Sequence, residues 1–336
     1  MRTVNRPECC TPRLLLVVTA LSAFFAPACH KESPTGPGEQ STPSPEIHAI
    51  DARVRRTVIA ELASSLRESY LDVRAAEGMA TKIESRLADG DYDAIDDAHS
   101  FAVRLEEDLH AISDDRHLLV TFCDRPAKPD GSQRFDNHGF AHVELHDGNI
   151  GYVEILTLAG SPGARDAAAK AMARLSEARA LILDLRKNRG GAASMVNFLC
   201  SHLFETRTLL YTLERRSGKK RTEAWTSPDG LGHRFSGDVP VFVLVSGETF
   251  SAAEGLAYVL QQYGRAKVVG ETTKGGAHPN MVRALPADFM TSIPSMRVVH
   301  PVSGDDWEGV GVQPDVQCAS NDALTTALRL ARSSLR

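Results

Sequence analysis

Three segments place polar residues and glycines directly after short apolar runs that have the composition of buried strands. They are residues 184–191 (DLRKNRGG), 247–254 (GETFSAAE) and 270–279 (GETTKGGAHP). In α/β folds, active sites gather where strands end and loops lead into the next helix. We therefore expect the three segments to lie close together and to carry the chemistry of the protein.

The middle segment contains the candidate nucleophile, Ser251, which is predicted to open a helix over residues 251–263. Free N–H groups and the positive end of the dipole at a helix start stabilise an alkoxide and then a tetrahedral oxyanion. Serine is also a common N-cap residue, and its position alone favours that structural role. The interpretation as a nucleophile therefore depends on the other two segments.

The first and third segments supply groups that would assist a nucleophile. Gly190 and Gly191 let backbone N–H groups turn toward a ligand and form an oxyanion cradle, although a tight turn without a ligand explains them equally well. Lys274 and His278 in the third segment are alternative general bases. Taken together, the three segments favour an enzyme site over three unrelated turns.

The elements that position these segments follow from the hydrophobic periodicity. Apolar residues recur at four-residue steps from about residue 54 to 112, which predicts three short amphipathic helices. Further along, strand-like runs alternate with alanine-rich helical stretches, as is typical of an α/β core. The runs are 118–122, 150–156, 180–185, 241–246 and 267–270, and the stretches are 164–179, 192–204 and 251–263. We predict a helical bundle domain at 47–117 and an α/β core at 118–336.

The composition is that of a globular protein and excludes a nucleic-acid binder. Of the 336 residues, 42% are hydrophobic and 24% are charged, and the net charge of −5 leaves no basic stripe. The spacing of Cys123, Cys200 and Cys318 matches no metal-binding pattern. Two states of these cysteines remain open: one disulfide with one free thiol, or three free thiols. We expect neither a metal ion nor a cofactor.

The first 28 residues have the features of a signal peptide, because arginines precede an apolar run at 14–28 that is too short to span a bilayer. Cys29 follows at once, and the context resembles a bacterial lipobox in which Ala26 replaces the usual leucine. Lipidation of Cys29 is expected, with simple secretion as the alternative. Residues 29–46 lack large apolar side chains and form a disordered tether. The protein is thus predicted to be exported and to reach the membrane through Cys29, facing the periplasm or the cell exterior.

Three long motifs carry a resemblance to a known family. DLRKNRGG, FSAAEGLAYVLQQYGRAKVVGETTKGGAHP and DWEGVGVQPDV together resemble the catalytic half of peptidase family S41, the tail-specific or C-terminal processing proteases. The similarity runs from about residue 54 to 316, and the nearest branch contains interphotoreceptor retinoid-binding protein modules and the tricorn protease. It implies a core similar to ClpP and crotonase. The PDZ module that tail-specific proteases usually insert does not fit into the 32 residues between His117 and Ile150.

The resemblance also implies a general base. Tail-specific members pair the serine with a lysine 25 residues later, but that position is Gly276. Tricorn-like members use a histidine and a glutamate instead, and the matching residues are His117 and Glu308. His117 would take the proton of Ser251, and Glu308 would orient His117 or stabilise its imidazolium. One departure is Arg116, which stands where tricorn-like enzymes have a serine.

By the same resemblance, the backbone N–H groups of Gly190 and Ala252 would hold the oxyanion. Lys274 and His278 remain the rival bases.

The sequence therefore predicts a serine-type peptidase that acts on peptides or unfolded proteins through an acyl-enzyme on Ser251. The alternatives are a non-proteolytic binding module for an apolar ligand and an esterase that uses the same serine. The polar stretch 217–236 forms either part of the cleft wall or a plain surface loop. The sequence indicates no oligomeric state.

Overall fold

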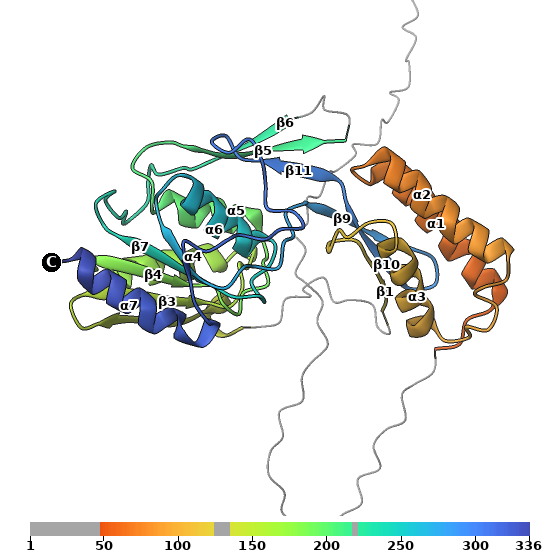
Figure 1. Ribbon diagram of the computed structural model, residues 1–336, viewed down its shortest axis with the longest axis horizontal. Helices are drawn as coiled ribbons and strands as arrows, with labels where there is room; N and C mark the ends of the chain where they lie inside the picture. The colour runs from red at the N-terminus through yellow and green to blue at the C-terminus, as the bar shows by residue number, and fades with distance from the viewer. Residues whose placement is uncertain (1–47, 124–134, 217–220) are drawn as a thin grey trace, which may run out of the picture.

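The computed structural model describes residues 48–123, 135–216 and 221–336. The predicted signal peptide, Cys29 and the tether lie outside the described residues, as do residues 217–220 of the polar stretch. An α/β lobe that ends at the C-terminus lies beside a smaller lobe built on three helices (Figure 1). Among the described residues, none of the helices combines the length and the apolar content needed to cross a bilayer.

The three N-terminal helices are α1 (Ala52–Ser69), α2 (Val73–Ala88) and α3 (Ala98–His110). Each begins after an aspartate whose carboxylate accepts hydrogen bonds from the first-turn N–H groups, namely Asp51, Asp72 and Asp97. Their apolar faces pack together into one buried core. The three predicted helices are therefore present, each starting at a cap that satisfies its free backbone donors.

A small antiparallel sheet completes this helical lobe. Its strands lie in the order β1-β10-β9. They are β1 (Leu119–Phe122), β9 (Asn280–Ala284) and β10 (Phe289–Pro294). Val120, Phe289 and Ile293 are buried in the same core as the helices. The helical lobe thus includes strands from beyond residue 117, where the sequence analysis placed the domain boundary.

The central sheet of the α/β lobe has six strands in the order β12-β8-β7-β4-β3-β2. Neighbouring strands run parallel from β12 to β3, and β2 pairs antiparallel with β3 at the edge. The strands are β2 (Phe140–His146), β3 (Ile150–Ile155), β4 (Ala180–Asp184), β7 (Val241–Val245), β8 (Lys267–Gly270) and β12 (Val316–Gln317).

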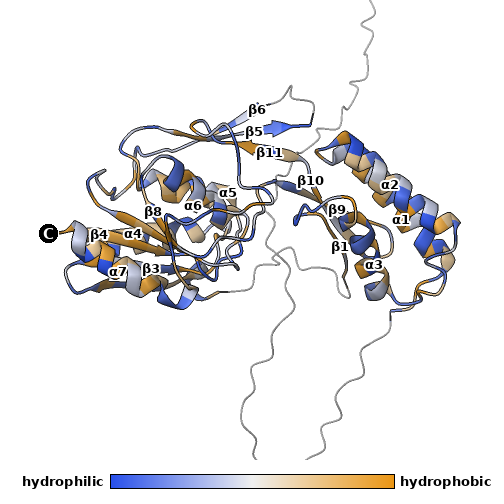
Figure 2. Cartoon of the chain, viewed as in Figure 1, coloured by the Kyte–Doolittle hydropathy of each residue, from blue (hydrophilic) through white to orange (hydrophobic). Residues whose placement is uncertain are grey.

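Helices cover both faces of this sheet. Three helices pack on one face and a fourth packs on the other. They are α4 (Ala164–Arg174), α5 (Ala193–Ser201) and α6 (Ala252–Gln262), and opposite them α7 (Ala323–Ser334). Side chains alternate between the faces, so that Leu181 and Leu183 join the α4–α6 core and Ile182 joins the α7 core. The central strands are accordingly mostly apolar (Figure 2).

A third sheet lies above the α/β lobe in Figure 1, extends toward the helical lobe and has the order β11-β5-β6. Its strands are β5 (Leu209–Arg215), β6 (Arg221–Trp225) and β11 (Met296–Val299). Only Ser295 separates β10 from β11, so one continuous segment links this sheet to the helical lobe. Short 3₁₀ turns occur at Asp136–Gly139 and Ser320–Asp322.

The predicted mixed α/β core preceded by three helices is confirmed, with one difference. The run at 118–122 was expected to begin the α/β core, but β1 pairs with β10 outside the central sheet. The physical reason is that Leu118 and Val120 bury their side chains among the helices. Cys200 and Cys318 are free thiols, and Cys123 Sγ donates to Met290 Sδ at 3.5 Å.

Candidate active site

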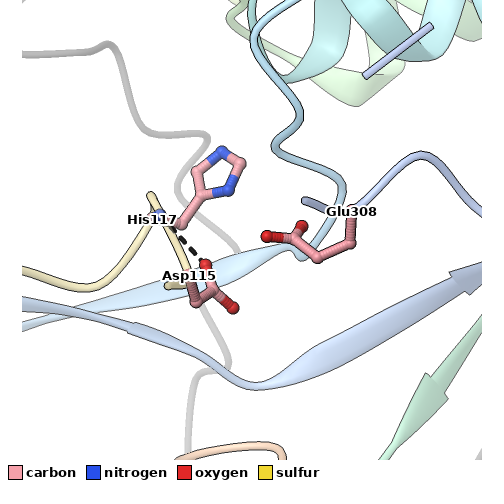
Figure 3. Close-up of side chains that lie close together, drawn as sticks. All are labelled: Asp115, His117 and Glu308. Atoms are coloured by element: carbon pink, nitrogen blue, oxygen red, sulfur yellow. Dashed lines mark hydrogen bonds between the residues drawn. The ribbon is translucent and has the colours of Figure 1, made fainter. Parts of the chain in front are cut away.

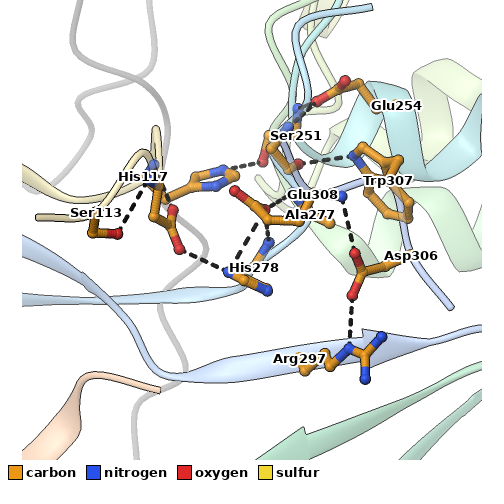
Figure 4. Close-up of polar contacts among 12 residues, drawn as sticks. Ser113, His117, Ser251, Glu254, Ala277, His278, Arg297, Asp306, Trp307 and Glu308 are labelled. Carbon is orange, nitrogen blue, oxygen red and sulfur yellow. Dashed lines mark hydrogen bonds and ion pairs between the residues drawn. The ribbon is translucent and has the colours of Figure 1, made fainter. Parts of the chain in front are cut away.

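Ser251 occupies the sharp turn between β7 and α6. Its backbone φ of 56° lies in a region that residues other than glycine seldom adopt. The Ser251 N–H donates to Glu254 Oε2 at 2.7 Å, which holds the turn in this conformation. The side chain faces the helical lobe, where Ser251 Oγ lies 2.9 Å from His117 Nε2 (Figure 4). The strained turn therefore aims the hydroxyl at a histidine rather than at its own helix.

His117 lies just before β1 and is 7% exposed. Its N–H donates to Asp115 Oδ1 at 3.0 Å, its carbonyl accepts from Ser292 Oγ at 2.7 Å, and its ring stacks on Phe250 with centroids 4.6 Å apart. Burial lowers the pKa of His117 to about 4, because the imidazolium is poorly solvated there. The ring is thus neutral at pH 7, and Nε2 can accept the serine proton while Nδ1 carries a hydrogen.

Glu308 lies on the loop between β11 and β12, half-buried on the other side of His117. Glu308 Oε2 accepts hydrogen bonds from the N–H groups of Ala277 at 2.5 Å and His278 at 3.1 Å. Both Glu308 Oε1 and His117 Nδ1 are buried without a hydrogen-bond partner among the described residues. Figure 3 shows the carboxylate and the ring facing one another, and the polar atoms of Asp115, His117 and Glu308 lie within 4.8 Å of one another. Burial, with the Asp115 charge, raises the pKa of Glu308 to about 7.

Glu254 ties the serine turn to the loop after β8. The side chain is fully buried, and besides the Ser251 N–H it accepts from Thr273 Oγ1 at 2.5 Å, Gly275 N at 2.6 Å and Gly276 N at 2.9 Å. Gly276 in this loop has no room for a side chain. A Cβ there would lie 2.2 Å from the Phe250 ring and 2.8 Å from His117 Cε1. The position at which the resemblance places a lysine is therefore closed by the stacked histidine.

The glycine turn after β4 runs directly beside Ser251. A Cβ on Gly190 would lie 2.9 Å from Ser251 Cβ and 3.2 Å from Ala252 N, and the Gly190 φ of 108° also requires glycine. The Gly190 N–H donates to Asn188 Oδ1 at 2.8 Å. In this arrangement that N–H is engaged, so the Gly190 peptide must leave Asn188 before it can bind an oxyanion.

Two models of known families match the chain. The model for peptidase family S41 matches residues 149–318, just over half of the chain, and the model for the N-terminal domain of these peptidases in eukaryotic IRBP, the interphotoreceptor retinoid-binding protein, matches residues 44–147. The chain belongs to peptidase family S41. The resemblance drawn from the sequence motifs is thereby confirmed.

Individual relatives of this S41 chain are distant. The chloroplastic carboxyl-terminal-processing peptidase 3 of Arabidopsis thaliana is 32% identical over 157 residues, which cover 45% of this chain and 28% of the relative. A carboxyl-terminal-processing protease of Picosynechococcus is 28% identical over 174 residues, 51% of this chain and 40% of the relative. The chain thus spans well under half the length of these relatives.

A solved structure shows the shared fold. A protein from Parabacteroides merdae described as a candidate peptidase superposes with a TM-score of 0.59 at 21% identity, covering 83% of this chain and 96% of that chain.

The alternative bases of the S41 chain lie elsewhere in the site. Within the described residues, Ser251 Oγ is hydrogen-bonded to His117. Lys274 Nζ lies 5.1 Å from the centre of the Phe250 ring, and burial, with Arg116 and Arg189 nearby, lowers its pKa. His278 instead contacts Asp115, with Nδ1 2.7 Å from Asp115 Oδ2.

Four residues of the site were not predicted. Glu254 had a detectable signal, because Ser251 and Glu254 have the spacing of a capping box, S-x-x-E. Asn188 stands in the motif DLRKNRGG and Asp115 lies two residues before His117, but neither was given a role. Asn188 is fully buried, and its Nδ2 donates to the Ile155 carbonyl at 2.9 Å. Nothing in the local sequence marks Phe250 as the residue that stacks on His117.

Asp115, His117 and Glu308 are of the types that bind divalent metals. Both Asp115 oxygens, however, already accept hydrogen bonds, from His117 N and His278 Nδ1, and His117 Nε2 faces Ser251. Hydrogen bonding within the protein accounts for the arrangement, and we assign no metal to it.

Proposed function

We propose that this member of family S41 is a serine peptidase that hydrolyses peptide bonds through an acyl-enzyme on Ser251. The observation that carries the proposal is the 2.9 Å contact between Ser251 Oγ and Nε2 of the buried His117. A neutral imidazole in hydrogen-bond reach of a hydroxyl is the arrangement that activates a weak nucleophile at neutral pH. The proposal is supported by the family assignment and by the names of the relatives, which are processing peptidases.

In the proposed reaction, His117 Nε2 takes the proton as Ser251 Oγ attacks the scissile carbonyl. The imidazolium that forms would donate its Nδ1–H to Glu308 Oε1, the facing carboxylate oxygen, which has no other partner in the described part of the chain. His117 then gives the proton to the leaving amine, and a water molecule repeats the sequence to release the acyl group. Glu308 must be ionised to stabilise the imidazolium.

The tetrahedral oxyanion would be held by the N–H of Ala252 at the start of α6, where the helix dipole adds a favourable field. Gly190 would supply the second N–H once its peptide turns away from Asn188. Substrate binding would therefore include a small rearrangement of the glycine turn. We propose peptides or unfolded protein segments as substrates.

Export is a separate part of the proposal and depends on residues 1–46 alone. The apolar run, the small residues before Cys29 and the tether support a lipoprotein facing the periplasm or cell exterior. Expression of the full chain with a radiolabelled fatty acid tests this, with Cys29→Ala as the matched variant. Incorporation that persists in Cys29→Ala would exclude lipidation at this residue.

The test of the enzymatic proposal is labelling by a fluorophosphonate probe, which reacts with an activated serine. Wild type is expected to label, and Ser251→Ala and His117→Ala are expected to lose labelling. Ser333→Ala and His142→Ala change an exposed serine and an exposed histidine and serve as controls. A folded wild type that does not label would contradict the proposal and favour a binding module. Labelling with ester cleavage but no peptide cleavage would favour an esterase.

A further inference from the structure

A second histidine, His278, connects His117 to Glu308 on the side of the site that faces away from Ser251. Asp115 is buried, and its two oxygens accept from different partners: Oδ1 from the His117 N–H at 3.0 Å and Oδ2 from His278 Nδ1 at 2.7 Å. His278 in turn donates its backbone N–H to Glu308 Oε2 at 3.1 Å (Figure 4). The contacts run from His117 through Asp115 and His278 to Glu308, whose free oxygen faces His117 again.

This cluster brings two carboxyl groups together in a half-buried place. Asp115 and Glu308 repel one another when both are ionised, and such repulsion keeps one of them protonated unless a cation is present. His278 Nδ1 lies 2.7 Å from Asp115 Oδ2 and 3.6 Å from Glu308 Oε2. Burial disfavours a charged His278 ring, but the Asp115 hydrogen bond and the Glu308 charge outweigh it, and the pKa of His278 is raised.

The other charged and titratable groups around the cluster do not replace this cation. Asp306 adds negative charge but is paired with Arg297 at 3.0 Å. Tyr70 is neutral, since burial raises its pKa to about 12. His117 is neutral for the reason given above, and Lys274 acts on His117 from the Phe250 side. His278 is the cation in contact with both carboxylates.

We propose that His278 is a positioning residue whose imidazolium, hydrogen-bonded to Asp115, keeps Glu308 ionised and directed at His117. The inference rests on the proposed function in one respect, namely that Glu308 serves His117. It assigns His278 a role different from that of a general base, and it gives Asp115 a role as well. The expected consequence is that the site works at a lower pH than the buried Glu308 carboxyl would otherwise allow.

The decisive variant is His278→Asn. The asparagine Nδ2 can take the place of histidine Nδ1 and keep the hydrogen bond to Asp115, while the positive charge is lost. The carboxyl carbon of Glu308 is followed by NMR as the pH is changed, with its signal identified by its loss in Glu308→Gln. The titration midpoint is expected to be higher in His278→Asn than in wild type by about one pH unit or more. Equal midpoints would overturn the inference.

The pH profile of fluorophosphonate labelling gives a second readout. In His278→Asn the acidic limb is expected to move up by about one pH unit, with rates that approach wild type at high pH, where Glu308 ionises unaided. His278→Lys restores a cation and is expected to move the limb back, and the exposed His142→Asn is the control. A uniform loss at every pH would show a merely structural role. If wild type does not label at all, the proposed function fails. The NMR titration still shows whether the His278 charge keeps Glu308 ionised.

Discussion

The turns after β4 and β7 lie next to one another at the same edge of the central sheet. One contributes a side chain to the site, and the other contributes backbone. The turn after β7 presents a side chain, that of Ser251. The turn after β4 presents backbone, through Gly190 and Gly191. All three residues have positive φ, at 56°, 108° and 136° respectively.

The two turns differ only in part in how each is maintained. Ser251 adopts its conformation against the preference of a residue with a Cβ, and the buried Glu254 carboxylate holds its N–H. The glycine turn is held in a similar way, because the Gly190 N–H donates to the buried Asn188 Oδ1. It also depends on glycine at position 190, since an added Cβ would lie 2.9 Å from Ser251 Cβ. Both turns thus use a buried side-chain acceptor, and the turn that presents backbone requires empty space as well.

The largest effect is expected from filling that space with Gly190→Ala. The added Cβ would lie 2.9 Å from Ser251 Cβ, so the nucleophile must move. We expect the labelling rate to fall by about 100-fold or more, because displacements near 1 Å have effects of that size. Gly148→Ala is the matched control, since Gly148 has a φ of 89° but nothing within 4 Å of an added Cβ. Similar labelling rates for the two variants would mean that the close approach is unimportant.

The next effect is expected from Glu254→Gln, which disturbs the turn that presents the side chain. The amide NH₂ would face backbone donors, leaving buried N–H groups unsatisfied. We expect a loss of about 2 kcal/mol in the free energy of unfolding and about a tenfold slower labelling. The control is Glu248→Gln in the same turn, whose exposed pair with Arg189 contributes little. Denaturant unfolding measures the stability of both variants, and the probe measures their labelling rates. Equal stabilities would show that Glu254 does not hold the turn.

The pH dependence tests the carboxylate that faces His117 rather than either turn, because Glu308 lies on the loop between β11 and β12. Glu308, with a pKa of about 7, is protonated as the pH falls and then cannot stabilise the His117 imidazolium. Labelling at pH 6.5 is expected to be about fourfold slower than at pH 8. A rate that stays constant down to pH 5 would contradict this and would match the pKa of His117 alone, which is about 4.

The smallest effect is expected from Lys274→Met in the third turn. Methionine keeps an unbranched apolar side chain against Phe250 and removes the ammonium. A general base contributes about 100-fold or more, so a labelling rate within about twofold of wild type would exclude that role for Lys274. Lys187→Met, at an exposed pair with Glu154, serves as the control. A loss of 100-fold would instead make Lys274 the base and leave His117 a structural residue.

Much of the fold could be predicted because it has local causes. The period of the apolar residues marks α1–α3, and short β-branched runs mark β3, β4, β7 and β8. The sheets that contain β5, β6, β9, β10 and β11 were not predicted. Strands β5, β6, β9 and β11 are only partly buried, and the pairs β1–β10 and β5–β11 join segments that lie far apart in the sequence. The pairing of Leu119 with Ser292 is an example that no local pattern encodes.

The candidate site divides in the same way. Ser251, His117 and Glu308 were named from motif resemblance, and the structure brings them together, while their roles remain predictions. Asp115 was overlooked because its partner, His278, lies 163 residues away in the chain. The engagement of the Gly190 N–H by Asn188 could not be predicted either, since it depends on a side-chain rotamer.

The lack of space at Gly276 bears on how such enzymes can change over time. A lysine at this position would overlap Phe250 and His117 Cε1, so it would disable the existing base before it could act as a new one. Exchanging a histidine-based site for a lysine-based site therefore demands coordinated replacement of at least three residues, with inactive intermediates between. Lineages that carry one solution are expected to retain it, and an engineer who wants the other must first remove both rings.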